Sequence, residues 1–260
     1  MSEYERVRYE RRGDVGVVTI EDPPLNLFGD ELIHDLGAAL AEAADDSIRA
    51  MLVRAEGRYF TGGADVHIFE DKSREEAAEL FDGLLEITHR VEEMPFPTLA
   101  SVHGLCLTAG FELALACDLI MAARSSRFGL IEIVVGLTPA MGGTQRVAER
   151  AGPARARELV MTGELYGAEA LERWNVVNYV VEDEELDERS SAFAERLAAG
   201  PTRANEATKR MVRAFLEHGV RGADARVGEI AAPLFGTEDL QHAVKTFLAE
   251  GPGKATFEGR

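Results

Sequence analysis

The amino-acid sequence predicts an α/β fold with a helical C-terminal region, and three observations support this prediction. The hydrophobic fraction of 46% suits a globular core. Segments with strand-like and helix-like patterns alternate in the first part of the chain, which is typical of parallel strand pairing. Strand signals then disappear after about residue 183. We therefore expect a core over residues 1–195 and a helical extension over residues 196–260.

The core is expected to open with a β-hairpin and then to alternate strands with helices. Residues 7–10 and 15–20 alternate polar and apolar side chains around a turn at Gly13-Asp14. Apolar residues recur at helical spacing over residues 29–44 and 73–93. The remaining expected elements are strands at residues 50–54, 98–102 and 118–123, a loop at 104–110, a buried helix at 112–116, and helices at 184–199, 202–218 and 237–249.

The chain is acidic, with 46 Asp and Glu residues against 28 Lys and Arg and a net charge of −18. Because nucleic acids and anionic membranes are held by clustered cations, we expect neither as a partner. Cys106 and Cys117 show neither a disulfide framework nor a zinc-binding spacing, and no metal is expected. The N-terminal residues show no apolar signal segment, and no run approaches the roughly 20 apolar residues of a membrane span. These features predict a cytoplasmic protein.

Two glutamates stand alone in apolar surroundings. Glu112 lies at the start of the expected buried helix, and Glu132 is the only charge among residues 128–136. An unpaired buried carboxylate is costly, so such a group is normally protonated, paired or functional. Glu112 has a structural alternative as a cap of its own helix, and Glu132 has one as a partner of Arg146 or Arg127. If the two converge, they form the kind of carboxylate pair that performs acid–base chemistry.

Two short glycine-bearing loops each leave an apolar strand and enter a helix. They are residues 61–64 (TGGA) and 107–110 (LTAG). Free backbone N–H groups at a helix N-terminus favour negative charge, and two such donors that converge would form an oxyanion hole. Most single loops of this kind are ordinary turns. Their spacing fits neither a Walker-type phosphate loop nor a dinucleotide fingerprint.

Three ordered segments resemble motifs of the enoyl-CoA hydratase/isomerase family, also called the crotonase superfamily. Residues 59–65 (YFTGGAD) are similar to the family pattern F-x-x-G-A-D. Residues 102–118 (VHGLCLTAGFELALACD) resemble V-N/H-G-x-A-x-G-G-G-x-E-L-x-x-x-C-D, and residues 128–146 (FGLIEIVVGLTPAMGGTQR) resemble F-x-x-P-E-x-x-x-G-x-x-P-x-x-G-G-T-Q-R. The resemblance covers nearly the whole chain. It implies a spiral core of ββα units and a C-terminal helical trimerisation region that builds homotrimers, usually stacked as hexamers.

The resemblance also implies which residues form the site. By position, Ala64 and Ala109 would supply the backbone N–H groups of an oxyanion hole, and Glu112 and Glu132 would be the catalytic glutamates. The residues implied to bind the substrate are Leu25, Gly62, Asp65 and Val66 at the coenzyme A portion, Ala140 at the water, and Phe247 at the adenine. Coenzyme A is part of the substrate, so no separate cofactor is implied.

One departure from the family motifs falls in this site. The family's G-G-G reads Thr108-Ala109-Gly110 here, and the extra Cβ of Ala109 is expected to narrow the approach to the thioester. Two of the implied residues also keep structural alternatives. Asp65 is as well explained as a helix-capping residue, and Phe247 as part of a helix–helix core.

The expected reaction is hydration of a 2-enoyl-CoA thioester to a 3-hydroxyacyl-CoA. Glu112 would activate water, and Glu132 would act as the acid or base nearest C2. The alternative is an enoyl-CoA isomerase or another acyl-CoA lyase of the family, because many isomerases keep only the glutamate at the Glu132 position. A scaffold or RNA-binding role is a further alternative, against which the net charge of −18 and both glutamates argue. The sequence leaves the acyl chain length open.

Overall fold

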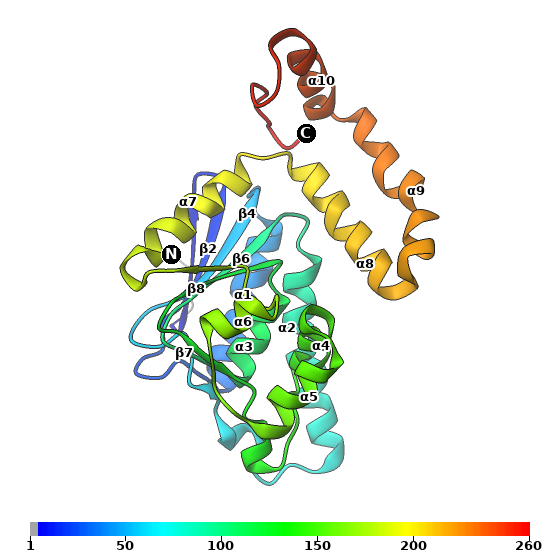
Figure 1. The fold of residues 1–260 in the computed structure, drawn as a ribbon. Helices are drawn as coiled ribbons and strands as arrows, with labels where there is room; N and C mark the ends of the chain where they lie inside the picture. The colour runs from blue at the N-terminus through cyan, green and yellow to red at the C-terminus, as the bar shows by residue number, and fades with distance from the viewer. Residues whose placement is uncertain (1–4) are drawn as a thin grey trace.

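The structure, a computed structural model, describes residues 5–260 (Figure 1). Its main sheet has six strands in the order β1-β2-β4-β6-β8-β11. The predicted hairpin is confirmed, since β1 (Val7–Arg12) and β2 (Val15–Ile20) pair antiparallel, whereas the other strand pairs of this sheet are parallel. The further strands are β4 (Ala50–Ala55), β6 (Thr98–Val102), β8 (Leu119–Ala123) and β11 (Tyr179–Val181). The first four residues of the expected core lie outside the described residues.

Helices cover both faces of the main sheet (Figure 1). One face carries α1 (Asp30–Asp45), α2 (Arg74–Glu93) and α3 (Thr108–Ala116), and the other carries α7 (Leu186–Ala198). Successive strand side chains point to opposite faces, so Val18 of β2 belongs to the first apolar layer and Val17 to the second. Because both faces are covered, β4, β6 and β8 are buried along nearly their whole length and are mainly apolar rather than alternating.

Helix α3 is buried along its whole length, as its apolar sequence predicts. It packs against the loop that precedes β5 (Gly63–Ala64). This close approach requires a glycine, because a Cβ at Gly110 would lie 1.9 Å from Thr61 Cγ2. The N-terminus of α3 and the 61–64 loop are therefore held side by side.

Two small sheets complete the core, and they correct one prediction. The first joins β7 (Leu105–Leu107), β9 (Arg127–Gly129) and β10 (Tyr166–Gly167), and the second joins β3 (Leu27–Phe28) with β5. The loop predicted over residues 104–110 is wrong, because β7 lies there and α3 already begins at Thr108. Strand β7 pairs in parallel with β9. A strand of three residues with a distant partner carries no periodic signal of its own.

Short helices connect the second half of the core, between residues 124 and 183, where no elements were expected. They are α4 (Gly143–Ala151), α5 (Pro153–Thr162), α6 (Ala168–Arg173) and the 3-10 turn Glu132–Val135. A further 3-10 turn, Val66–Phe69, follows β5 in the first half. Gly152, with a φ of 84°, separates α4 from α5. Pro153 then begins α5, a position where its missing N–H is not needed.

The C-terminal helices extend away from the sheet (Figure 1). They are α8 (Thr202–Asp224), α9 (Val227–Ala231) and α10 (Glu238–Glu250). Helix α8 passes its predicted end at residue 218, with a non-helical break at Gly219. The predicted fold class, an α/β core with a helical C-terminal region, is confirmed, while the boundary between residues 195 and 196 stays a prediction. Within residues 5–260, no helix combines the length and apolarity needed to cross a membrane.

Candidate active site

A cavity of about 200 Å³ lies where α3 meets the 61–64 loop and the 132–135 turn. Its wall is mainly apolar, with two carboxyl side chains. The apolar residues include Phe28, Ile33, Ile68, Leu84, Val134, Leu137 and Met141. The four residues expected to carry the chemistry also line it, namely Ala64, Ala109, Glu112 and Glu132. The structure therefore brings together residues that are far apart in the sequence, in the kind of apolar pocket that binds small molecules.

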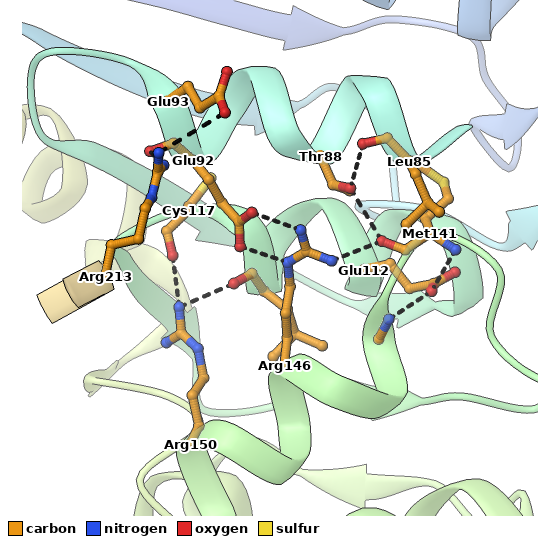
Figure 2. Close-up of polar contacts among 12 residues, drawn as sticks. Leu85, Thr88, Glu92, Glu93, Glu112, Cys117, Met141, Arg146, Arg150 and Arg213 are labelled. Carbon is orange, nitrogen blue, oxygen red and sulfur yellow. Dashed lines mark hydrogen bonds and ion pairs between the residues drawn. The ribbon is translucent and has the colours of Figure 1, made fainter. Parts of the chain in front are cut away.

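Glu112 projects from the first turn of α3 and is bonded to the start of a different helix. Its Oε1 accepts hydrogen bonds from the N–H groups of Met141, at 2.8 Å, and Gly143, at 2.7 Å (Figure 2). The alternative that Glu112 caps its own helix is therefore wrong, because these donors belong to the N-terminal end of α4. A Cβ at Gly143 would lie 2.8 Å from Glu112 Cγ, so this arrangement needs glycine there.

The pKa of the Glu112 carboxyl lies far above the ordinary range of a glutamate. Burial is the main cause that raises its pKa to about 8, and the nearby charge of Glu132 contributes in the same direction. The N–H groups of Gly143 and Met141 and the charge of Arg146 oppose this shift without cancelling it. The group is therefore mainly protonated at neutral pH and can act as an acid.

Glu132 opens the turn Glu132–Val135, and both of its carboxylate oxygens are buried without a hydrogen-bond partner. Burial raises the pKa of this carboxyl to about 7. The structural alternative for Glu132 is wrong, because both candidate cations are engaged elsewhere. Arg146 forms two hydrogen bonds of 2.7 Å with Glu92, and Arg127 Nη2 donates to the carbonyl of Leu165 at 2.9 Å.

A polar cluster behind the cavity holds the segment that supplies the N–H groups to Glu112. Arg146 lies between the carboxylate of Glu92 and the carbonyl of Met141, to which its Nη1 donates at 3.0 Å (Figure 2). The hydroxyl of Thr88 donates to the same carbonyl at 3.1 Å. Glu92, Thr88 and Met141 were not predicted from the sequence. The nearest signal is the GGTQR segment, residues 142–146, which contains Arg146.

The two expected oxyanion donors differ in their surroundings. Ala109 is the second residue of α3, so its N–H belongs to the first turn, whose N–H groups have no acceptor within the helix. The N–H of Ala64 instead donates to the side chain of Thr108, with a distance of 2.7 Å to Oγ1. Thr108 stands where the family motif has glycine, but this contact was not predicted from the sequence.

The residues implied for substrate binding are divided between two places. Gly62, Val66 and Ala140 line the cavity. Leu25 and Asp65 line a neighbouring open groove of about 630 Å³, and the Leu25 carbonyl accepts the Gly62 N–H at 2.7 Å. The side chain of Asp65 accepts a hydrogen bond from the His67 N–H and caps the turn Val66–Phe69, which confirms the capping alternative for this side chain.

Phe247 lies on α10 and is 58% exposed. Figure 1 shows α10 at the far end of the molecule from α3. Within one chain, therefore, this ring neither joins the cavity nor lies in a helix–helix core. Its role at the adenine stays a prediction.

Comparison with known proteins identifies the family of the chain. The family model described as "Enoyl-CoA hydratase/isomerase" matches residues 10–260. A protein of Rhizobium meliloti named "Probable enoyl-CoA hydratase" is 33% identical over 99% of both chains, and the 2,3-dehydroadipyl-CoA hydratase of Escherichia coli is 32% identical over 88% of both. A crystal structure of an enoyl-CoA hydratase subunit from Geobacillus kaustophilus covers all of both chains with a TM-score of 0.93 and 30% identity. The chain therefore belongs to the enoyl-CoA hydratase/isomerase family and has its crotonase-type fold.

Proposed function

We propose that this protein hydrates 2-enoyl-CoA thioesters to 3-hydroxyacyl-CoA. The observation that carries the proposal is the buried, unpartnered carboxyl of Glu132, which lines the same apolar cavity as the carboxyl of Glu112. A folded protein rarely leaves both oxygens of a buried carboxylate unpaired unless a ligand or water completes the site. Hydration needs both an acid and a base, and these two groups, with raised pKa values of about 8 and about 7, suit those tasks near neutral pH.

The proposed reaction moves two protons and forms one carbon–oxygen bond. The acyl oxygen is polarised by hydrogen-bond donors near Ala64 and Ala109, which favours negative charge on that oxygen. Water, held by the carboxyls, adds through its oxygen to C3 while the ionised carboxylate accepts one of its protons. The protonated carboxyl then gives its proton to C2. Because the substrate is neither oxidised nor reduced, we propose that no cofactor is needed beyond the coenzyme A of the substrate itself.

The position of the shared proton decides how the two glutamates divide these tasks. If it resides on Glu112, whose pKa is raised by burial and by the charge of Glu132, then Glu132 is the group that accepts a proton from water. The division expected from the sequence is the reverse, with Glu112 activating the water. Interacting carboxyls titrate as a pair, so the singly ionised pair is the reactive state in either case.

The wall of the cavity favours an apolar acyl group. None of the described residues that line it is Lys, Arg or His. A substrate whose acyl chain ends in a carboxylate, such as the one for which the Escherichia coli relative is named, would therefore bury a charge without a partner. We expect crotonyl-CoA to be hydrated with a kcat/KM at least about 10-fold above that of 2,3-dehydroadipyl-CoA, since a mismatched polar group costs about 1–3 kcal/mol.

The direct test is the hydration of crotonyl-CoA by the Glu112→Gln and Glu132→Gln variants. Glutamine keeps the size of the side chain, and its amide oxygen can still accept the N–H groups that Glu112 accepts, but it transfers no proton. Loss of a general acid or base costs roughly 10²–10⁴-fold in rate, so both variants should lose at least about 10²-fold. Glu149→Gln is the matched control, because Glu149 is exposed on α4.

The same assay separates hydratase from isomerase. An isomerase moves a proton between C2 and C4 and needs only one carboxyl. If Glu112→Gln leaves turnover of a 3-enoyl-CoA intact while Glu132→Gln abolishes it, and crotonyl-CoA is not hydrated, the protein is an isomerase. Normal hydration in both variants would mean that both glutamates are structural.

A further inference from the structure

Thr108 adopts a backbone conformation that its side chain disfavours. Its φ is +43°, in the left-handed region. A β-branched residue is a true outlier there, and such conformations persist only where the surrounding structure imposes them, often at functional sites. Glycine would adopt this conformation without strain. The threonine side chain must therefore contribute something that glycine would not.

The hydroxyl of Thr108 lies where an acyl oxygen would be expected to meet Ala64. Its Oγ1 is 2.7 Å from the Ala64 nitrogen and accepts that N–H. Donors of an oxyanion hole stand about 2.7–3.1 Å from the oxygen they stabilise, so Oγ1 occupies the place that an acyl oxygen would take in front of the Ala64 N–H. A Cβ at Gly63 would lie 2.3 Å from the same oxygen, so the glycine makes room for the hydroxyl. Thr108 also lines the cavity, beside Ala109.

A hydroxyl that accepts a hydrogen bond still has its own proton to donate. Among residues 5–260, no hydrogen bond uses the Thr108 hydroxyl as a donor. We propose that the Thr108 O–H is a direct donor to the acyl oxygen, in place of the Ala64 N–H, with the Ala109 N–H as the second donor. This inference rests on the proposed acyl-CoA site. The Ala64 N–H then acts through Thr108, because hydrogen bonds in a chain polarise and strengthen one another.

The sign of the change in Thr108→Gly distinguishes a donor from an obstruction. If the hydroxyl only blocks the Ala64 N–H in the free protein, glycine at position 108 frees that N–H to bind the acyl oxygen, and kcat rises. If the hydroxyl donates to the acyl oxygen, glycine removes that donor and kcat falls, although relief of the left-handed strain raises the melting temperature. Thr108→Val, which keeps the shape but places a methyl against the Ala64 N–H, should lower kcat by about 10²-fold or more.

The experiment is an infrared measurement of butyryl-CoA labelled with ¹³C at the thioester carbonyl, bound to the full-length protein. This saturated ligand cannot be hydrated, so its carbonyl frequency reports hydrogen bonding independently of the glutamates. In the unsubstituted protein the carbonyl band should shift to lower wavenumber. Thr108→Ser should keep most of that shift, whereas Thr108→Gly and Thr108→Val should lose much of it.

Each outcome decides a different point. An unchanged or larger shift in Thr108→Gly, or a higher kcat, overturns the role of Thr108 but leaves the hydratase proposal intact. Absence of any shift in the unsubstituted protein removes both, because butyryl-CoA then does not enter the hole. A normal pattern of shifts, combined with full hydration in Glu112→Gln and Glu132→Gln, supports Thr108 while the proposed roles of the glutamates fail.

Discussion

Two regions of the molecule differ in what their side chains lack within one chain: in the cavity a buried carboxyl lacks a hydrogen-bond partner, and in the C-terminal region apolar side chains lack a cover. In the cavity, both oxygens of Glu132 are buried without a hydrogen-bond partner. In the C-terminal region, residues 202–250, the situation is reversed, because large apolar side chains such as Phe235, Phe247 and Leu248 are exposed to solvent. A buried polar group and an exposed apolar surface are both unfavourable in isolation, and both commonly mark binding sites.

The difference between these regions indicates what each one binds. The cavity is small and lies against the main apolar core, so a small molecule and water suffice to complete it. The C-terminal helices have only a minor apolar cluster of their own, around Ala214, Ala223 and Ile230, and need a larger partner. Their contacts with the core include polar ones, such as Lys209 Nζ to Asp118 Oδ2 at 2.8 Å. We expect this larger partner to be further copies of the same chain, as the family resemblance implies.

The largest expected effect concerns the pair of glutamates in the cavity. If Glu112 and Glu132 share one proton and one water, removing either carboxyl disables the unit. Each single change to glutamine should then lose at least about 10²-fold in hydration, and the double variant should lose much less than the product of the two, because groups that act as a unit are not additive. Losses that multiply in the double variant would show that the carboxyls act independently.

The pH dependence of hydration should reflect the same pair. Below pH about 7 the Glu132 carboxylate becomes protonated and no base remains, and above pH about 8 Glu112 loses its proton and no acid remains. We therefore expect a narrow, bell-shaped dependence of kcat/KM on pH. On each side of the maximum, kcat/KM should fall about 10-fold per pH unit. Glu112→Gln should abolish the alkaline limb of the remaining activity. An alkaline limb that persists in this variant would assign that limb to another group.

The raised pKa values also predict how stability changes with pH. Both carboxyls bind protons more tightly in the folded protein than in the unfolded chain, whose carboxyl pKa is the ordinary 4.5. This contribution to the stability of the fold is therefore most favourable below pH 4.5 and is lost as the pH rises through about 8. The difference in melting temperature between pH 6 and pH 9 should be smaller in Glu112→Gln than in the unsubstituted protein.

A smaller, discrete effect is expected at the C-terminal helices. Light scattering should give a mass of three or six chains of 28.3 kDa. Leu248→Glu places a charge on the exposed apolar surface of α10, where Leu248 is 80% exposed, and should shift the protein toward monomers. Lys245→Glu is the matched control, because it adds negative charge on the same helix without removing an apolar side chain. A monomeric unsubstituted protein would contradict the assembly.

The sequence predicted those parts of the fold that have local or periodic signals. The hairpin, helices α1 and α2 and the buried helix α3 follow from alternation or helical spacing within a few residues. Strand β7 and the true start of α3 at Thr108 were missed, because they depend on pairing with β9 and on packing against Thr61. Boundaries set by distant contacts leave no trace in the local pattern.

In the candidate active site, too, contacts between residues that are distant in the sequence could not be predicted. Two glutamates isolated among apolar residues were recognisable as candidates, and the structure places them in one cavity. Their partners were not predictable, since the N–H groups of Met141 and Gly143 become donors to Glu112 only when α4 is placed against α3. The contact between Ala64 and Thr108 was equally hidden, because the two residues lie 44 positions apart.

The smallest expected effect tests how the two regions are joined. Arg49, the residue before β4, donates to the carbonyls of Gly200 and Phe257, at 2.6 and 2.9 Å, and to Thr202 Oγ1 at 3.0 Å. Lysine keeps the charge but cannot satisfy these divergent acceptors, so Arg49→Lys should cost about 1–3 kcal/mol. The lost hydrogen bonds connect the core to the C-terminal region. Amide hydrogen exchange should therefore accelerate in α8–α10 and not in the main sheet, and crotonyl-CoA hydration should persist. Arg54→Lys is the control, because Arg54 lies on β4 and donates to Thr19 of β2 rather than to the C-terminal region. If hydrogen exchange instead accelerates equally in the sheet and in the C-terminal helices, the two regions unfold as one unit.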